Sequence, residues 1–312
     1  MRAVTLESVP STPAVTEVDI PRPEAGELLV KVAAASLNGI DAATAAGYTQ
    51  AFMEHRFPLV LGQDFAGTVE AVGEGMDGFA VGDAVFGAVM KPFLGAGSLA
   101  EYVTVSAGHG VARYSAGLKA EDAGAPAVAG TTALESLNAA TLAEGETVLV
   151  SGATGGVGAL AVQLAAARGA KVIATARPGT QTDFVTGLTE AEVHVVDFTG
   201  DLPAQVRAIA PDGVDAVLHL AGDGAVLAGL LRPGGQLAST TGLTQDAVEG
   251  QDVTVHTIMA KPNAQTLTAL AVQVVSGALR VPVTATYPLE RATEAFAAFG
   301  AGTPCKIAVT CS

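Results

Sequence analysis

The segment "VLVSGATGGVGALAVQLAAARGAKVIATARP", residues 148–178, decides the fold class of this chain. It begins with an apolar run of strand length, continues through a glycine-rich turn into a helical stretch, and ends with a second apolar run. Gly152, Gly155 and Gly158 follow the spacing G-x-x-G-x-x-G. Glycines between a strand and a helix let the backbone approach a pyrophosphate group and let the helix pack closely on the strand. The segment therefore predicts half of a dinucleotide-binding site.

The first turn of this helix is expected to bind the cofactor phosphates. Its amides have no partners inside the helix, and the helix dipole favours an anion at this end. We assign this role to Thr154, Gly155, Gly156 and Val157. A bare glycine triplet can also be only a tight turn. The strand before it and the helix and strand after it favour the dinucleotide interpretation.

The end of the second apolar run indicates which dinucleotide binds. An NAD-binding chain normally carries Asp or Glu there, which bonds the ribose 2′-hydroxyl and repels a 2′-phosphate. This chain has Thr175, Ala176 and Arg177 instead. The missing acid and the guanidinium of Arg177 favour NADP, and Thr175 adds a hydroxyl donor. The alternative is that Arg177 is a solvated turn residue before Pro178.

The following part of the chain continues the alternation of strands and helices. Most of its strand candidates are apolar nearly throughout, as is typical of parallel strands that are covered on both faces. They cover residues 147–152, 171–176, 192–198, 215–222, 235–240 and 252–258. Six strands with helical crossovers predict a doubly wound parallel sheet and therefore an α/β fold class.

Residues 1–122 have a different pattern. Short runs with β-branched residues, separated by turn residues, predict an all-β, partly barrel-like unit. The clearest of these runs are residues 28–37, 65–73, 82–89 and 97–105. The tail, residues 286–311, has the pattern of a strand, a helix and a strand, and we expect it to return to this first unit.

Composition and charge exclude several classes of protein. The chain has 312 residues, of which 49% are hydrophobic and 15% charged, so a sizeable core is available. No apolar run is long enough to span a membrane, and the N-terminus lacks the apolar stretch of a signal peptide, so we expect a cytoplasmic protein. The formal net charge of −15 argues against nucleic acid as a partner. Cys305 and Cys311 are expected to be free thiols, as a reducing compartment leaves them.

Several motifs along the chain together resemble the medium-chain dehydrogenase/reductase superfamily, and within it the zinc-independent quinone oxidoreductases. "FPLVLGQDFAGTVEAVGEGMDGFAVGDAVFG" (residues 57–87) looks like the hallmark of that superfamily's first domain, and four shorter motifs also fit. These are "GSLAEYVTV" (97–105), "AGTTALESL" (129–137), "LRPGGQLAS" (231–239) and "CKIAVTC" (305–311). The resemblance implies a GroES-like β-rich catalytic domain, residues 1–122 and 264–312, and a Rossmann domain, residues 123–263.

The positions that hold zinc in related enzymes carry other residues here. Zinc-dependent members use Cys, His and Glu, whereas this chain has Asn38 at the first position and Gln63-Asp64 at the second and third. The cysteine-rich lobe that holds structural zinc in those relatives is missing. Asn and Gln are poor zinc ligands, so we expect no metal site. The five histidines share no metal-like spacing, and only His55 falls near the presumed cleft.

The resemblance also implies the chemistry. Without a Lewis acid, the natural reaction is hydride transfer from NADPH to a quinone or another electron-poor conjugated carbonyl compound, with the protein supplying orientation. By resemblance, Asn38 and Asp41 lie at the cleft near the nicotinamide. Tyr48 is the best candidate for the proton donor. It can equally be an aromatic residue that lines the pocket wall, with water as the donor.

Other positions follow from the same resemblance. Thr132, or its neighbour Thr131, is placed to meet the nicotinamide or its phosphate, and Gly222 and Gly242 border the nicotinamide ring. Asp64 is expected to be structural and to bond the backbone in the turn after Gly62. Lys306 matches the second residue of the family's Gly-Lys pair, in which Cys305 replaces the glycine, and the role of both residues is open.

Two other functions and one mode of assembly complete the expectations. The chain can be an enoyl reductase of a lipid or polyketide pathway, or a cofactor-binding protein with little catalysis. The alternating segment 252–260 predicts an outer strand whose open edge pairs with a second copy, giving a homodimer. The alternative is a monomer whose edge is covered by a loop or by the helix at residues 265–279.

Overall fold

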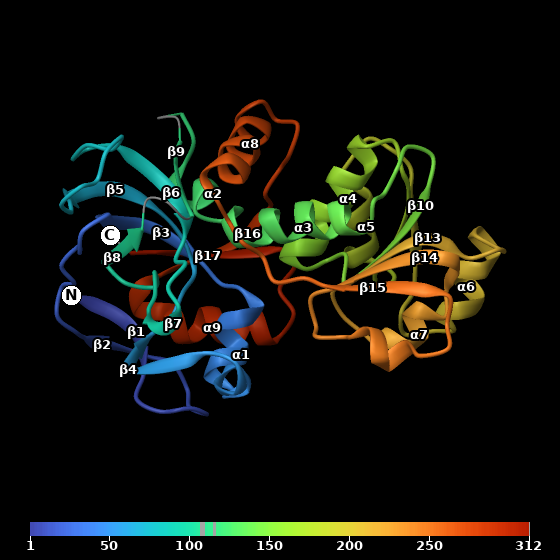
Figure 1. Cartoon of the computed structure of the whole chain (residues 1–312), viewed down its shortest axis with the longest axis horizontal. Coiled ribbons are helices and arrows are strands. Elements are labelled where there is room, and N and C mark those ends of the chain that lie inside the picture. The colour runs from blue at the N-terminus through green and yellow to red at the C-terminus, as the bar shows by residue number, and fades with distance from the viewer. Residues whose placement is uncertain (107–109, 115–116, 312) are drawn as a thin grey trace. The chain divides into compact units, whose positions relative to one another are not determined.

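The computed structural model describes residues 1–106, 110–114 and 117–311, and the chain divides into two compact units. The first unit comprises residues 1–131 and 261–312, and the second comprises residues 132–260 (Figure 1). The sequence predicts these junctions at 122/123 and 263/264. The first junction falls later because Ala123 and Ala127 are buried against Ala66 and Phe86 of the first unit.

The second unit is built on a six-stranded parallel sheet in the order β12-β11-β10-β13-β14-β15. This order confirms the doubly wound sheet that the sequence predicts. The strands are β10 (Thr147–Ser151), β11 (Lys171–Thr175), β12 (Val193–Val196), β13 (Val214–His219), β14 (Leu231–Ser239) and β15 (Val253–Thr257).

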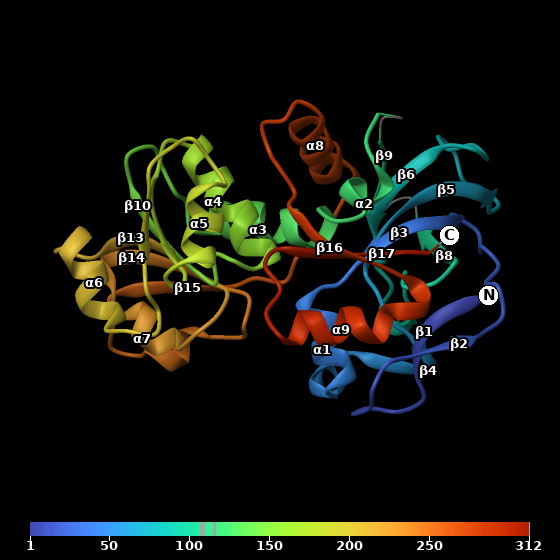
Figure 2. The same ribbon diagram turned by 180° about the vertical axis from the view of Figure 1, so that it is seen from behind.

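Helices cover both faces of this sheet. Figures 1 and 2 show α4 (Gly156–Ala167) and α5 (Thr180–Thr186) on one face and α6 (Leu202–Ile209) and α7 (Gly224–Ala228) on the other. Helix α4 is buried along its whole middle, from Gly158 to Ala165, because small and apolar residues occur on all its sides. This burial explains why its sequence shows no polar face.

The first unit contains a seven-stranded and a four-stranded sheet. Strand β3 (Glu27–Ser36) is the centre of the larger one. Its two edges pair antiparallel with β5 (Asp64–Val72) on one side, and with β8 (Tyr102–Ser106) and then β17 (Lys306–Thr310) on the other. The larger sheet also includes β16 (Val283–Pro288), β6 (Ala84–Ala88) and β9 (Val111–Arg113). The smaller one has the order β2 (Ala14–Glu17), β1 (Arg2–Leu6), β4 (Glu54–Val60) and β7 (Phe93–Ala96).

The prediction of an all-β first unit is wrong, because short helices cross between its strands. They are α1 (Gly39–Ala45), η1 (Tyr48–Ala51) and α2 (Ala120–Ala123), and the part of the unit after residue 260 adds α8 (Ala264–Val275), η3 (Leu289–Arg291) and α9 (Ala292–Gly300). None of the helices that the structure describes combines the length and apolar character that a membrane crossing requires. A shared core of aliphatic side chains and Phe65 fills the unit.

The C-terminal tail returns to the first unit, as the sequence predicts. Ala308 of β17 pairs antiparallel with Ser36 of β3, which places the last strand inside the larger sheet. Cys305 and Cys311 flank this strand, and both are buried free cysteines. Burial raises the pKa of each thiol to about 12, so both stay protonated at neutral pH. Cys305 adopts φ +57°, a left-handed conformation that disfavours side chains and explains why glycine suits this position.

Candidate functional site

The glycine-rich turn after β10 has the close backbone approach that the sequence predicts. Gly152 adopts φ +78°, which favours glycine. A Cβ atom on Gly158 would lie 2.2 Å from the carbonyl oxygen of Gly152, so only glycine fits where α4 begins beside the strand. The Gly152 amide donates to Oγ1 of Thr175 over 2.9 Å. The hydroxyl oxygen of Thr175, expected to face the cofactor, thus ties the turn to the end of β11.

The N-terminus of α4 offers amides to an anion. Gly155 precedes the helix and has no side chain to cap it. The first hydrogen bond of the helix runs from the Ala159 amide to the Gly155 carbonyl oxygen. The amides of Gly156, Val157 and Gly158 therefore have no partner within the helix. Half-buried Thr154 lies in the turn just before them. This arrangement fits the pyrophosphate of a dinucleotide, because such amides bind anions without a side-chain cation.

Arg177 follows β11 and is exposed. Its guanidinium lies 5.4 Å from the ring centroid of Phe198, and its backbone amide donates to Gln181. Asp197, which directly follows β12, interacts electrostatically with Arg177. The pKa of Asp197 is lowered by hydrogen bonds from Thr199 and also by the charge of Arg177. The end of β11 itself thus carries a cation and no carboxylate.

Two further turns lie at the carboxyl ends of β13 and β14, which parallel strands bring to the same edge of the sheet as the glycine-rich turn. Gly222 and Gly242 occupy these turns with φ +89° and +85°, and both are exposed. His219, one of the five histidines to which the sequence analysis gave no site, connects them. Its Nε2 atom lies 3.2 Å from the Gly222 carbonyl oxygen, and its Nδ1 atom lies 3.1 Å from the Ser239 hydroxyl.

The threonines expected to meet the nicotinamide lie on α3 (Ala127–Ala139). Thr132 is buried, with 7% of its surface exposed. The Oγ1 atom of Thr131 is also buried, and it has no hydrogen-bond partner among the described residues.

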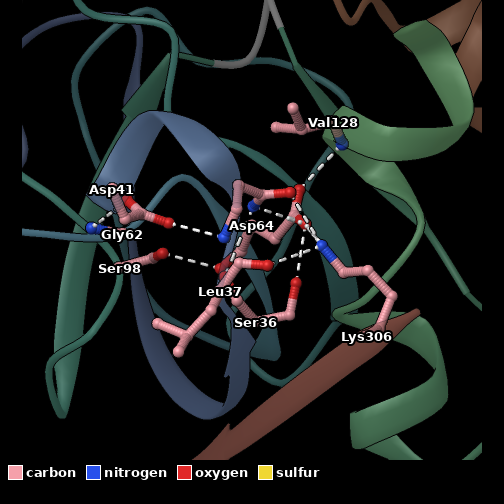
Figure 3. A network of polar contacts seen from close by, with 9 residues as sticks. Ser36, Leu37, Asp41, Gly62, Asp64, Ser98, Val128 and Lys306 are labelled. Carbon is pink, nitrogen blue, oxygen red and sulfur yellow. Dashed lines mark hydrogen bonds and ion pairs between the residues drawn. The ribbon is translucent and has the colours of Figure 1, made fainter. Parts of the chain in front are cut away.

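A buried polar centre lies in the first unit (Figure 3). The Asp64 carboxylate accepts hydrogen bonds from the Ser36 hydroxyl at 2.7 Å, the Asn38 side-chain amide at 3.0 Å and the backbone amide of Val128 at 2.8 Å. The Lys306 ammonium completes the centre, 3.1 Å from the Asp64 carboxylate and 2.7 Å from Oδ1 of Asn38. The positive charge of Lys306 thus balances the negative charge of Asp64 within the protein. Asn38 belongs to the hydrogen-bond network around this pair.

Asp41 performs the role that the sequence analysis gave to Asp64. Its two carboxylate oxygens accept from the backbone amides of Asn38 at 2.8 Å and Gly62 at 3.1 Å, whereas the Asp64 carboxylate bonds the backbone at Val128. The predicted partner of Asp64, the backbone of the turn at Gly62, is wrong. The start of α1 brings Asp41 to this turn instead. Burial raises the pKa of Asp41 to about 7, against the opposing effect of these hydrogen bonds. Asp41 also lines a shallow pocket of this unit.

Tyr48 and His55 have different environments. Tyr48 begins η1, and 76% of its surface is exposed. His55 lies on β4, where its Nε2 atom is 2.8 Å from the Thr49 hydroxyl. The Thr49 hydroxyl donates in turn to Thr44, which lines the same pocket as Asp41. Nδ1 of His55 is buried and has no hydrogen-bond partner among the described residues.

The donor set of the polar centre does not fit zinc. Asn38 and Asp64 stand at two positions that the sequence resemblance assigns to zinc ligands. The Lys306 ammonium already donates a hydrogen bond to the Asn38 amide oxygen and neutralises the Asp64 carboxylate. A metal ion there would meet a like charge. Within residues 1–106, 110–114 and 117–311, no group of three His, Cys, Asp or Glu side chains has a geometry that could hold a metal ion.

Two family models match the chain. The "Alcohol dehydrogenase GroES-like domain" matches residues 24–115, and "Zinc-binding dehydrogenase" matches residues 191–304. The first match covers β3 to β9 of the first unit. The second runs from β12 through the rest of the sheet into the C-terminal tail.

Individual relatives and solved structures are similar over larger parts. The chain is 36% identical to the chloroplast envelope quinone oxidoreductase homolog of Arabidopsis thaliana, over 66% of this chain and 62% of that protein. It is 33% identical to an acryloyl-coenzyme A reductase of Metallosphaera sedula, over 55% of this chain and 58% of that protein. These matches thus span less than two thirds of each relative.

The fold is similar over the whole chain to a solved structure. The quinone oxidoreductase from Coxiella burnetii superposes with a TM-score of 0.87 at 26% identity, covering 100% of this chain and 99% of that one. The sheet order, the GroES-like first unit and these similarities lead to one assignment. The chain belongs to the medium-chain dehydrogenase/reductase superfamily, in its quinone oxidoreductase-like branch.

Proposed function

We propose that this protein is an NADPH-dependent oxidoreductase that transfers a hydride to a quinone or another electron-poor conjugated carbonyl compound without zinc. The observation that carries the proposal is the edge of the second sheet. There, three amides at the start of α4 without a partner in the helix suit a pyrophosphate, and an exposed Arg177 without a carboxylate beside it on β11 suits a 2′-phosphate. The similarity to quinone oxidoreductases supports the acceptor class.

NADPH supplies the hydride when it is bound. The chain's own residues orient the cofactor and the substrate, and they protonate the substrate. The α4 amides hold the phosphates, and the turns at Gly222 and Gly242, joined through His219, border the nicotinamide ring. Thr132 is proposed to contact the same part of the cofactor. On the substrate side, the exposed phenol of Tyr48 is proposed to donate a proton to the developing enolate or hydroquinone oxygen.

Steady-state assays test this proposal. NADPH and NADH are each supplied with a panel of quinones, and the expected result is quinone-dependent oxidation with kcat/KM for NADPH well above that for NADH. Tyr48→Phe is expected to lower kcat roughly a hundredfold or more, as removal of a general acid does. Equal use of NADH, or no turnover with any quinone, contradicts the proposal.

An enoyl reductase is the second candidate, and the similarity to an acryloyl-coenzyme A reductase favours it. Acyl thioesters with a conjugated double bond replace the quinones in the same assay. Turnover of the thioester with no turnover of quinones assigns the chain to this second class. Cofactor binding without turnover of either substrate class would indicate a protein with little catalysis.

Assembly and compartment belong to the same proposal. We propose a homodimer through β15, the outer strand of the second sheet, and a cytoplasmic location, with a small molecule and no nucleic acid as partner. Light scattering decides the assembly, because a monomer has a mass of 31.0 kDa and a dimer twice that mass.

A further inference from the structure

Strand β15 turns half of its backbone groups away from the sheet. It is the outermost strand, and it pairs only with β14 within its sheet. The Gly234 amide donates to the Asp252 carbonyl oxygen, and the Ile258 amide donates to the Ser239 carbonyl oxygen, each over 2.7 Å. Backbone groups of even-numbered residues therefore face β14. Because the backbone groups of successive residues in a strand face opposite edges, those of Val253, Val255 and Thr257 face outward.

A single side chain occupies two of these outward groups. The Nε2 atom of Gln245 donates to the Val253 carbonyl oxygen over 3.0 Å, and its Oε1 atom accepts from the Val255 amide over 2.8 Å. A carboxamide offers the same donor and acceptor as a peptide group of a neighbouring strand. The Thr257 hydroxyl also donates to the Leu243 carbonyl oxygen over 3.0 Å, which holds the preceding loop against the strand.

We propose that Gln245 is an edge cap: it closes β15 to strand pairing, and a second copy of this chain pairs there only after the side chain has left. The sequence analysis expects this edge to be open, whereas in the structure a neutral carboxamide occupies it. Edge strands are commonly protected by such local devices.

The cap acts on most bonds of the symmetric pairing. Two antiparallel β15 strands related by a twofold axis at Val255 form six hydrogen bonds. Two join the Val255 amide of one copy to the Val255 carbonyl oxygen of the other, and the other four join Val253 of one copy to Thr257 of the other. Gln245 holds the Val255 amide and the Val253 carbonyl oxygen, so it blocks both Val255 bonds and both bonds from a Thr257 amide to a Val253 carbonyl oxygen. With both caps in place, only the two bonds from a Val253 amide to a Thr257 carbonyl oxygen can form.

Sedimentation of three proteins tests this inference, which refines the homodimer proposed above. They are the wild type, Gln245→Ala and the control Gln251→Ala, an exposed glutamine of the same loop. The dimer of Gln245→Ala is expected to be roughly tenfold tighter or more, since no side-chain bonds need to break first. Gln251→Ala is expected to match the wild type. Adding Val255→Pro to Gln245→Ala removes the outward amide and is expected to abolish the gain.

Hydrogen exchange at a concentration where all variants are monomeric tests the cap independently of dimer formation. The Val255 amide is expected to exchange faster in Gln245→Ala than in the wild type or Gln251→Ala. An unchanged exchange rate of Val255 overturns the cap, as does an unchanged dimer affinity where dimers form. Absence of dimers in every variant overturns the homodimer of the proposed function, and the Val255 exchange rate then decides the cap by itself.

Discussion

The Nζ atom of Lys306 lies 3.1 Å from the Oδ2 atom of Asp64, and only 2% and 0% of the two side chains are exposed. The two residues are 242 positions apart in the sequence. Their pair joins the start of β5 to the start of β17, so it fastens the C-terminal tail into the larger sheet of the first unit. The side chains of Ser36 and Asn38, the Val128 amide and the Leu37 carbonyl oxygen make the remaining hydrogen bonds of the pair.

Lys306→Met is expected to lower the free energy of unfolding by about 3–5 kcal/mol, because it leaves the Asp64 carboxylate buried without its counter-charge. Asp64→Asn leaves the opposite charge unpaired and is expected to have a similar effect. The double variant should lose much less than the sum of the two, since no unpaired charge remains. Urea unfolding of the four proteins measures this coupling, and strictly additive losses contradict it.

The pH dependence of stability is expected to report on Asp41. Burial raises the pKa of its carboxyl to about 7 in the folded chain, above the ordinary value of 3.8, while nearby Asp64 raises it and Lys306 lowers it. Between these two values the folded chain binds the proton that the unfolded chain releases. The contribution of Asp41 is therefore complete below pH 4 and is lost as the pH rises through 7, by roughly 4 kcal/mol at most.

Asp41→Asn removes this titration. The free energy of unfolding of the variant, measured in urea at several values between pH 5 and pH 8, is expected to fall less steeply with pH than that of the wild type. Asp77→Asn changes an exposed aspartate of the same unit and is the control. A slope that Asp41→Asn leaves unchanged contradicts the raised pKa.

Two glycines of the same turn provide a matched pair of variants. A Cβ atom at Gly158 would lie 2.2 Å from the Gly152 carbonyl oxygen, whereas one at Gly155 would lie 3.4 Å from it. Gly158→Ala is expected to lower Tm because the start of α4 must move away from β10. Gly155→Ala is expected to keep Tm near that of the wild type and to weaken NADPH binding, because the added methyl group lies where the phosphates approach. Equal Tm losses in both variants contradict this reasoning.

Arg177→Ala tests the choice of cofactor. Loss of a charge-assisted bond to the 2′-phosphate costs about 1.5–3 kcal/mol, so KM for NADPH is expected to rise roughly ten- to a hundredfold while KM for NADH changes little. Arg207→Ala, which alters an exposed arginine of α6 in the same unit, is the control. Equal changes in both KM values would show that Arg177 does not distinguish the cofactors.

The protein is expected to be active without stoichiometric zinc. Asn38 and Gln63 are poor ligands, and the Lys306 ammonium lies against the oxygens of Asn38 and Asp64. Elemental analysis of the purified protein, together with activity before and after treatment with a chelator, checks this expectation. About one zinc ion per chain, lost along with activity, would falsify it.

The sequence by itself determined the second unit and the return of the tail. The glycine triplet and the apolar runs are local patterns, and strands and helices of that composition bury their apolar surface when helices cover a parallel sheet, as in a doubly wound fold. The spacing of Gly152 and Gly158 indicated the close backbone contact because glycine is needed where a Cβ atom would collide. The resemblance of the motifs added the β-rich first unit, but not the short helices α1, η1 and α2.

Only the tertiary structure decided the polar partners. Asp64 lies in the motif next to Gly62, yet the carboxylate that binds the Gly62 amide comes from Asp41, 21 positions away. The pairing of Lys306 with Asp64 and the cap of Gln245 on β15 leave no periodic trace in the sequence. A buried charge or an open strand edge accepts any partner that the fold brings within hydrogen-bonding distance, and that distance is set by the packing of distant segments rather than by neighbouring residues.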